Sequence, residues 1–215
     1  MQVNRAEALR YMRMGGATPD PVLADRLARV EREVLAACRP VSYWRLEPLA
    51  FGETPGALRI GPLDVTSCAL ARTLRGCRHA FLFCATLGAG VDALLRRYSQ
   101  TSGADALMAQ AVATALVESY CDDCEAKLLA EPAVAGERLR MRFSPGYGDL
   151  PLETQRALLQ VLDSARRAGI VLTETLLMVP SKSVSAVIGA GPDSADPPHT
   201  GCAACGKTDC AYRRR

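Results

Sequence analysis

Residues 142–147 read R-F-S-P-G-Y and bring several chemically distinct groups together. Arg142 supplies a guanidinium that can hold a carboxylate through two parallel hydrogen bonds, and Ser144 supplies a hydroxyl. The proline fixes one backbone angle, while Gly146 can adopt positive φ and lets a ligand approach the main chain. Tyr147 adds an amphipathic ring. The pattern also fits a strand that ends in a tight turn, so the segment is either a connector or a ligand loop.

A second motif reads L-T-E-T-L-L-M-V-P-S-K-S-V-S and ends at Ser185. Glu174, Pro180 and Ser183 are its other distinctive positions. The order R-x-x-x-G-Y, an amphipathic helix, then L-T-E-x-x-x-M-x-P-x-x-S-V-S resembles the S-adenosylmethionine-binding activation domain of vitamin B12-dependent methionine synthase. The resemblance runs over residues 104–189, and the chain resembles a free-standing version of this module.

The resemblance implies a reactivation component of a cobalamin-dependent methionine synthase system. In that family, cob(II)alamin is restored by reductive methylation, with the methyl group from S-adenosylmethionine and an electron from a donor such as flavodoxin. Arg142 would hold the methionine carboxylate, the backbone around Ser144 and Gly146 would hydrogen-bond to the ligand, and Tyr147 would pack against it or shape the loop. Such a transfer depends on proximity and electrostatics, so no catalytic acid or base is expected.

The cobalamin itself is expected on another chain. A corrinoid-binding motif, Asp-x-His-x-x-Gly, is missing around both histidines, His79 and His199. The 215 residues also leave no room for substrate barrels of about 250 residues each. The expected partner is a cobalamin-binding methionine synthase chain or another corrinoid protein, and the chain is not a complete methionine synthase.

Two departures from the family pattern stand close to these motifs. A second proline commonly follows Gly-Tyr in the family, whereas residues 148–149 are Gly-Asp here. An aromatic pair follows Ser-Val-Ser-Gly in the family, whereas residues 186–188 are Ala-Val-Ile. The second change removes an expected contact for adenine, so we expect weak binding or binding that needs the partner.

The cysteines near the C-terminus form a second candidate site. Cys202, Cys205 and Cys210, with His199 upstream, could share one tetrahedral metal such as zinc. An iron-sulfur cluster with a further ligand, or a thiol-bearing tail without metal, fits the same residues. The alternative functions follow from this tail: a non-catalytic metal-binding adaptor, or an iron-sulfur redox partner, of a corrinoid protein.

The remaining cysteines are predicted to be packing residues. Cys121 and Cys124 lie three positions apart on a predicted helix and share a face, so a shared metal or a redox pair is the alternative. A further four, expected to be buried, are Cys38, Cys68, Cys77 and Cys84.

Composition favours a cytoplasmic globular protein. The chain has 26 basic and 23 acidic residues and gives no footprint for nucleic acid. The longest apolar stretch, residues 79–91, is shorter than the roughly 20 residues that a membrane helix needs, and no secretory signal is visible. Nine cysteines in such a sequence indicate reduced thiols.

The pattern of helices and strands predicts an α+β fold with a mainly antiparallel, twisted sheet, a long central helix and a Cys-rich C-terminal tail. Residues 1–40 are expected to form N-terminal helices, residues 41–189 the α+β core, and residues 190–215 a linker and the tail. The core is expected to contain two strands within 43–65, a buried strand at 80–85 and the long helix from Ser102 to Ala130.

Four further elements are expected near the motifs. They are a strand at 139–143, a helix at 151–168, and strands at 173–179 and 183–188 with a bend or an edge at the intervening proline. The glycine-rich turn before the helix at 91–98 is expected to be structural, with a phosphate site as the alternative.

Overall fold

The computed structural model describes residues 1–16 and 18–192. The helices are α1 (Arg5–Tyr11), α2 (Pro21–Ala37), α3 (Cys68–Thr73), α4 (Ala89–Thr101), α5 (Gly103–Leu128), the 3₁₀ helix η1 (Pro132–Val134), α6 (Thr154–Val161) and α7 (Ser164–Ala168). The strands are β1 (Val41–Phe51), β2 (Ala57–Ile60), β3 (Leu63–Thr66), β4 (His79–Thr86), β5 (Arg138–Leu139), β6 (Val171–Leu172), β7 (Met178–Val179) and β8 (Ser183–Gly191).

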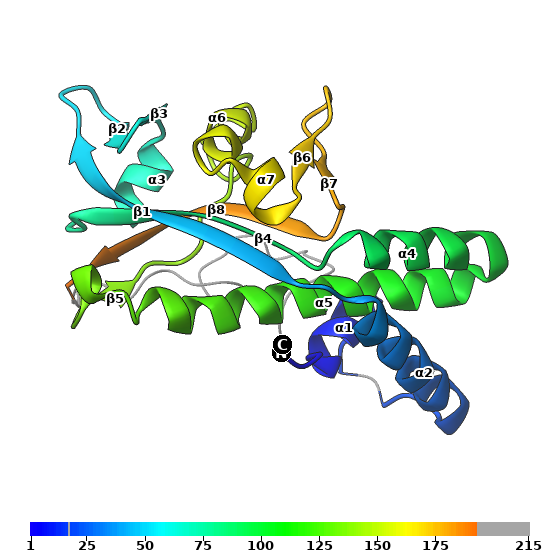
Figure 1. The fold of residues 1–215 in the computed structure, drawn as a ribbon. Coiled ribbons are helices and arrows are strands. Elements are labelled where there is room, and N and C mark those ends of the chain that lie inside the picture. The colour runs from blue at the N-terminus through cyan, green and yellow to red at the C-terminus, as the bar shows by residue number, and fades with distance from the viewer. Residues whose placement is uncertain (17, 193–215) are drawn as a thin grey trace.

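Six strands form one antiparallel sheet in the order β3-β2-β1-β4-β8-β5. The long helix α5 runs under one face of the sheet, while α3, α6, α7 and the β6–β7 hairpin cover the other face (Figure 1). The predicted fold class, with an antiparallel sheet and a long central helix, is confirmed.

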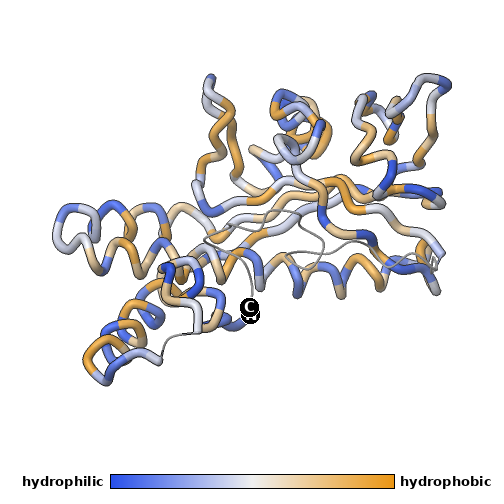
Figure 2. Tube along the Cα trace, turned by 180° about the vertical axis from the view of Figure 1, so that it is seen from behind, coloured by the Kyte–Doolittle hydropathy of each residue, from blue (hydrophilic) through white to orange (hydrophobic). Residues whose placement is uncertain are grey.

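The central strand β4 is hydrophobic throughout because both of its faces are covered. Phe81 and Phe83 form a buried cluster with residues in the C-terminal half of α5, among them Leu128. Leu82 and Cys84 point the other way and join a cluster with α3 and α6. Alternation of side chains along a strand assigns each residue to one cluster, and helices on both sides exclude water from both. Figure 2 shows hydrophobic residues along the central strands.

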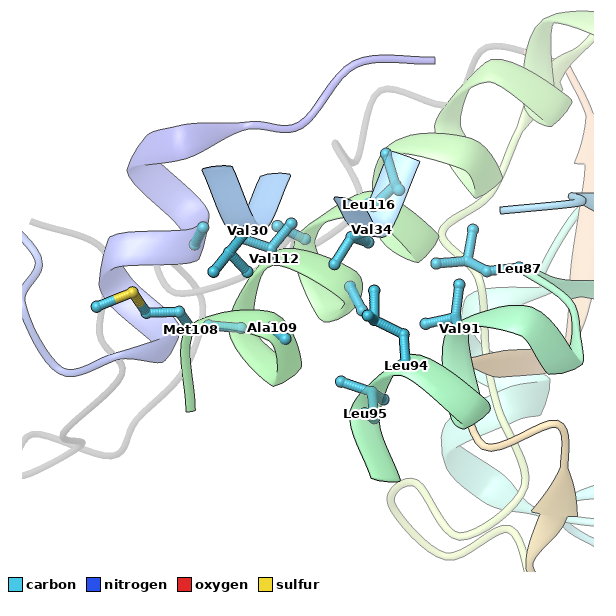
Figure 3. Packing of buried hydrophobic residues seen from close by; sticks show 14 of the residues in the cluster. Val30, Val34, Leu87, Val91, Leu94, Leu95, Met108, Ala109, Val112 and Leu116 are labelled. Carbon is cyan, nitrogen blue, oxygen red and sulfur yellow. The ribbon is translucent and has the colours of Figure 1, made fainter. Parts of the chain in front are cut away.

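The N-terminal half of α5 extends past the sheet and packs against other helices. Val112 and Leu116 of α5 contact a buried cluster with residues of α2 and α4 (Figure 3). Ser102 begins α5 as predicted, because its hydroxyl accepts a hydrogen bond from the Asp105 N–H at 3.3 Å. Residues of α1 and α2 belong to the same cluster, so the N-terminal helices pack against α5. The division of the chain at residues 40 and 189 stays a prediction.

Four expected elements differ in the structure. The strand expected at 139–143 is short: β5 covers only Arg138–Leu139, and Phe143 joins β8 through an isolated bridge to Val187. Residues 43–65 contribute to three strands, not two. The helix expected at 151–168 is divided into α6 and α7, because Asp163 adopts a left-handed conformation with φ of 49°. The strand expected at 173–179 is a hairpin, in which Leu176 has φ of 63° and the Leu177 N–H donates to the Thr173 hydroxyl at 3.0 Å. Local hydrogen bonds override strand propensity there.

Pro180 lies at a bend between β7 and β8, as expected, and follows a cis peptide bond. Cys68 is exposed, so the expectation that it is buried was wrong; it stands at the first position of α3, which faces solvent. Among the described helices, none has both the length and the hydrophobicity needed to cross a membrane.

Candidate functional site

The R-F-S-P-G-Y segment lies at an edge of the sheet, directly after β5. Phe143 exchanges two backbone hydrogen bonds of 2.9 Å with Val187 of β8, so the chain follows the sheet edge up to this residue. Phe143 packs into the cluster on the α3 and α6 side. Arg142 points to the opposite side, toward α5. The side chains of Arg142 and Phe143 therefore lie on opposite faces of the sheet at its edge.

Arg142 is held by three carboxylates that project from one side of α5. Its Nη1 donates to Glu125 Oε1 at 2.5 Å, and its Nη2 donates to Asp122 Oδ1 at 2.8 Å and to Glu118 Oε2 at 3.1 Å. The Arg142 side chain is only 17% exposed, whereas Asp122 is 68% exposed. We call these four residues the Arg142 cluster. It places one cation among three anions at the surface of the molecule.

The electrostatics of the Arg142 cluster favour a second positive charge. Burial disfavours the charged guanidinium, but the hydrogen bond to Asp122 and the charge of Glu125 outweigh it and raise the pKa of Arg142. Burial also raises the pKa of Glu125, and Asp122 adds repulsion that partly offsets the attraction of Arg142. The acidic groups therefore exceed what one arginine can neutralise.

The turn that follows Arg142 is closed by its own backbone. The Gly146 N–H donates to the Leu150 carbonyl at 2.9 Å, and the Tyr147 N–H donates to the Ser144 carbonyl at 3.1 Å. Gly146 has φ of 86°, a conformation that side chains disfavour. The N–H groups of Gly146 and Tyr147 are thus already hydrogen-bonded within the turn. The backbone contacts expected between a ligand and the region of Ser144 and Gly146 would therefore involve other backbone atoms of the loop.

Tyr147 is an exposed aromatic member of the predicted site. Its side chain is 60% exposed, and its ring stands edge-on to the Phe143 ring with centroids 5.3 Å apart. This contact fixes one side of the tyrosine and leaves the rest open to solvent. The ring can pack against a planar ligand group.

The loop is also tied to α3. Asp149 accepts hydrogen bonds from the Ser67 hydroxyl, from the Cys68 N–H at 2.8 Å and from the Ala69 N–H at 3.1 Å. These hydrogen bonds, first that of Ser67 and then that of Ala69, lower the pKa of the Asp149 carboxyl. In the sequence, Asp149 stands out only as a departure from the family pattern.

The second motif supports the loop from β8. Ser185 is buried and donates to Gln155 Oε1 at 3.2 Å, while Gln155 Nε2 donates to the Leu176 carbonyl at 3.0 Å. Gln155 thus links α6, which follows the loop, to β8 and to the β6–β7 turn. Ser183 Oγ lies 2.7 Å from the carbonyl oxygen of Pro180 and stabilises the bend.

Glu174 lies apart from the other site residues. It is exposed in the β6–β7 turn, and no hydrogen bond or ion pair joins it to Arg142 within residues 1–16 and 18–192. The structure therefore places Arg142 on the α5 side of the sheet edge and Tyr147 against Phe143 on the other side, joined by the turn at Ser144 and Gly146, and it leaves Glu174 apart.

The cysteines divide into two groups. His199, Cys202, Cys205 and Cys210 lie outside the described residues, so the metal site stays a prediction. In the part of the chain that the structure describes, no group of three potential metal ligands is close enough to hold an ion. Cys121 and Cys124 are buried and unpaired, which agrees with packing residues.

The carboxylates of the Arg142 cluster and Gln155 were not predicted from the sequence. The cluster had a visible signal, because residues 118–125 read E-S-Y-C-D-D-C-E and place acids at positions that share one side of a helix. Gln155 carried no such signal, since a single glutamine on an amphipathic helix is ordinary. Only its burial between α6 and β8 distinguishes it.

Comparison with known proteins identifies the family and the fold. A family model described as "Vitamin B12 dependent methionine synthase, activation domain" matches residues 75–211. A solved crystal structure of the MetH reactivation domain bound to AdoHcy superposes with a TM-score of 0.64 at 20% sequence identity, covering 90% of this chain and 76% of that one. At this identity the likeness shows the fold. No curated protein matches the chain.

Proposed function

Because the chain belongs to the family of vitamin B12-dependent methionine synthase activation domains, we propose that it binds S-adenosylmethionine and presents the methyl group to a cobalamin held by a partner chain. The observation that carries this proposal is the Arg142 cluster beside the Tyr147 loop. A guanidinium and an excess of carboxylates at one place match a ligand that has both a carboxylate and positive charges.

The Arg142 cluster offers partners for both the negative and the positive groups of S-adenosylmethionine. The ligand carries an α-carboxylate, an α-ammonium group and a sulfonium. Arg142 can take the carboxylate through charge-assisted hydrogen bonds. Asp122 and Glu118, which are the more exposed acids, can then face the ammonium or the sulfonium. In this arrangement the carboxylate of the ligand takes the place of one of the protein carboxylates that contact Arg142.

The ligand is proposed to lie across the edge of the sheet. The Arg142 side chain lies on the α5 side of the sheet edge. Tyr147 contacts Phe143, whose side chain lies on the opposite side. A molecule that reaches both residues must pass the turn at Ser144 and Gly146. An adenosyl group near Tyr147 and an amino-acid group near Arg142 would satisfy this geometry.

The residues 186–188 do not provide an adenine contact. Ala186, Val187 and Ile188 are buried within β8 and pack into the two clusters on the faces of the sheet. The exposed Tyr147 ring is therefore the proposed aromatic contact of the ligand loop.

The chain itself is proposed to position the reactants. The partner's cobalamin accepts the methyl group in a reaction that consumes one electron, from a donor such as flavodoxin, and releases S-adenosylhomocysteine. The residues of this chain bind and orient the sulfonium, and they need no acid or base for the transfer. The partner could be a methionine synthase chain without its own activation module or another corrinoid protein.

Calorimetric titration with S-adenosylmethionine, with and without a cobalamin-loaded partner, tests the proposal. We expect binding that strengthens when the partner is present. Methylcobalamin formation is then followed with labelled S-adenosylmethionine and a reductant. Absence of binding in both titrations would overturn the proposed function.

A matched control separates the site from general charge effects. Arg97 is an arginine on α4 that pairs with Glu33 at 2.6 Å, at the end of the molecule away from β5 (Figure 1). Arg97→Ala is expected to bind S-adenosylmethionine like the unmodified protein. Arg142→Ala is expected to weaken binding about a hundredfold. Equal effects of the two substitutions would contradict the assignment of the site.

A further inference from the structure

Asp149 fastens the R-F-S-P-G-Y loop to a segment that precedes the family-matched region. Its three donors, Ser67, Cys68 and Ala69, form the start of α3, whereas the family match begins at residue 75. Ser67 is itself buried and caps α3 by accepting the Leu70 N–H at 3.0 Å. The carboxylate thus binds a helix that packs on the core through Leu70, not another loop.

We infer that Asp149 is a positioning residue, which holds the Tyr147 loop in the conformation that binds S-adenosylmethionine. This inference rests on the proposed function, because it assigns a role in binding that same ligand. It goes further by naming a residue that need not touch the ligand and that acts through the loop.

The backbone around Tyr147 explains why an anchor is needed. Gly146 and Gly148 flank the tyrosine with φ of 86° and 58°. Glycine loses more conformational freedom on ordering than any other residue, so two of them around one binding residue favour a disordered loop. At one end the Phe143 pairing with β8 holds the chain. Asp149 supplies the corresponding restraint at the other end.

Close packing supports the same restraint. A methyl group added at Gly148 would lie 3.1 Å from the Ala69 side chain, so the loop backbone rests directly on α3. Asp149 follows Gly148 immediately, and its carboxylate spans the junction. Loss of the carboxylate would leave two N–H groups of α3 and the Ser67 hydroxyl without this acceptor. The loop would then occupy its binding conformation for a smaller fraction of the time.

The test compares Asp149→Asn with the same loss of charge at the N-terminus of another helix. Asparagine keeps the shape of aspartate but loses the charge. Its amide NH₂ group would face a backbone N–H, from which it cannot accept a hydrogen bond. Asp20 caps α2 by accepting the Leu23 N–H at 2.8 Å, on the other side of the sheet from α3 (Figure 1). Asp20→Asn therefore controls for the loss of a negative charge at a helix N-terminus, because the asparagine oxygen can still accept the Leu23 N–H.

Two measurements are made on each variant at a temperature where both remain folded. Calorimetry gives the dissociation constant of S-adenosylmethionine, and hydrogen–deuterium exchange gives the protection of residues 144–150 without ligand. For Asp149→Asn we expect a dissociation constant about tenfold higher, as for a loop that is competent one tenth of the time, and faster exchange in 144–150. For Asp20→Asn we expect less than about a twofold change in affinity and no change in that exchange.

The outcomes distinguish this inference from the proposed function. Unchanged affinity in Asp149→Asn, or an equal loss in Asp20→Asn, would overturn the positioning role. If the unmodified protein fails to bind S-adenosylmethionine even with its partner, the proposed function fails. The exchange data on the ligand-free protein then still decide whether Asp149 anchors the loop, and unchanged exchange would refute the anchor.

Discussion

Arg142 and Glu125 form an ion pair, with Nη1 and Oε1 2.5 Å apart, that joins the edge of the sheet to the central helix. Glu118 and Asp122 contact the same guanidinium. The Arg142 cluster is therefore satisfied without a ligand, and a bound carboxylate has to displace one of these acids. This competition, together with the buried residues 186–188, gives a physical reason to expect modest affinity.

Replacement of Arg142 should weaken S-adenosylmethionine binding in steps. Lysine keeps the charge but cannot make two parallel hydrogen bonds, so Arg142→Lys is expected to raise the dissociation constant about tenfold. Arg142→Ala removes a charged hydrogen bond and should raise it about a hundredfold. Calorimetry measures both. If lysine fully restored the affinity, Arg142 would act only as a point charge and not as a carboxylate fork.

Asp122 should contribute to discrimination between substrate and product. S-adenosylhomocysteine lacks the sulfonium charge, so an exposed acid near the ligand favours S-adenosylmethionine electrostatically. Asp122→Asn is expected to reduce the ratio of the two affinities about threefold, with a smaller effect at high salt because the group is exposed. Parallel titrations with both ligands measure the ratio. The control is Asp64→Asn, because Asp64 is similarly exposed and pairs with Arg59 on β2. A ratio unaltered by Asp122→Asn would contradict the proposed facing of acid and sulfonium.

Asp105 should stabilise the attachment of α2 to α5. Its two oxygens contact Arg26 Nε at 2.6 Å and Arg29 Nη2 at 2.9 Å, and its side chain is 8% exposed. Asp105→Ala leaves both arginines without this partner, but they are 39% and 43% exposed, so the free energy of unfolding is expected to fall by about 2 kcal/mol. Urea denaturation measures the change. The exposed Asp25 on the same helix as the arginines provides the control, and Asp25→Ala should have little effect.

The contribution of Asp105 should also depend on pH. The hydrogen bond from Arg26, with desolvation opposing it and Arg29 adding to it, lowers the pKa of Asp105 in the folded state. A lowered folded pKa means that the stabilisation is complete above the ordinary aspartate pKa of about 3.9 and is lost as pH falls through the lower value. The stability difference between the unmodified protein and Asp105→Asn should therefore shrink only below about pH 4. A difference that shrank near neutral pH would point to another group.

The cysteines should differ sharply in their reaction with a maleimide. Cys68 is exposed, whereas Cys84 is buried in the sheet, and burial raises its pKa to about 12. Because the thiolate is the reactive form, Cys68 should be labelled within the native protein and Cys84 only after unfolding. Peptide mapping by mass spectrometry identifies the labelled positions. Rapid labelling of Cys84 in the native protein would show that β4 is not covered on both faces.

The fold was largely predictable because its strongest elements are marked locally. The hydrophobic run at 80–85, the Ser102 cap and the apolar face of α5 require the same structure in most contexts. The β6–β7 hairpin was not predictable, because the hydrogen bond of Leu177 to Thr173 replaces an extended conformation that the residue types favour equally. The break between α6 and α7 similarly depends on one residue, Asp163, in a left-handed conformation.

The family and the antiparallel sheet with its long helix could be predicted without the structure, because they depend on short-range patterns and on ordered motifs. The ligand-binding role of the R-F-S-P-G-Y loop stays a proposal. Tertiary structure alone decided what surrounds Arg142. It brings Glu118, Asp122 and Glu125 from α5 to the guanidinium, and Ser67 of a distant segment to Asp149. Such contacts join residues far apart in the chain, and their energies depend on burial and distance, which no local pattern encodes.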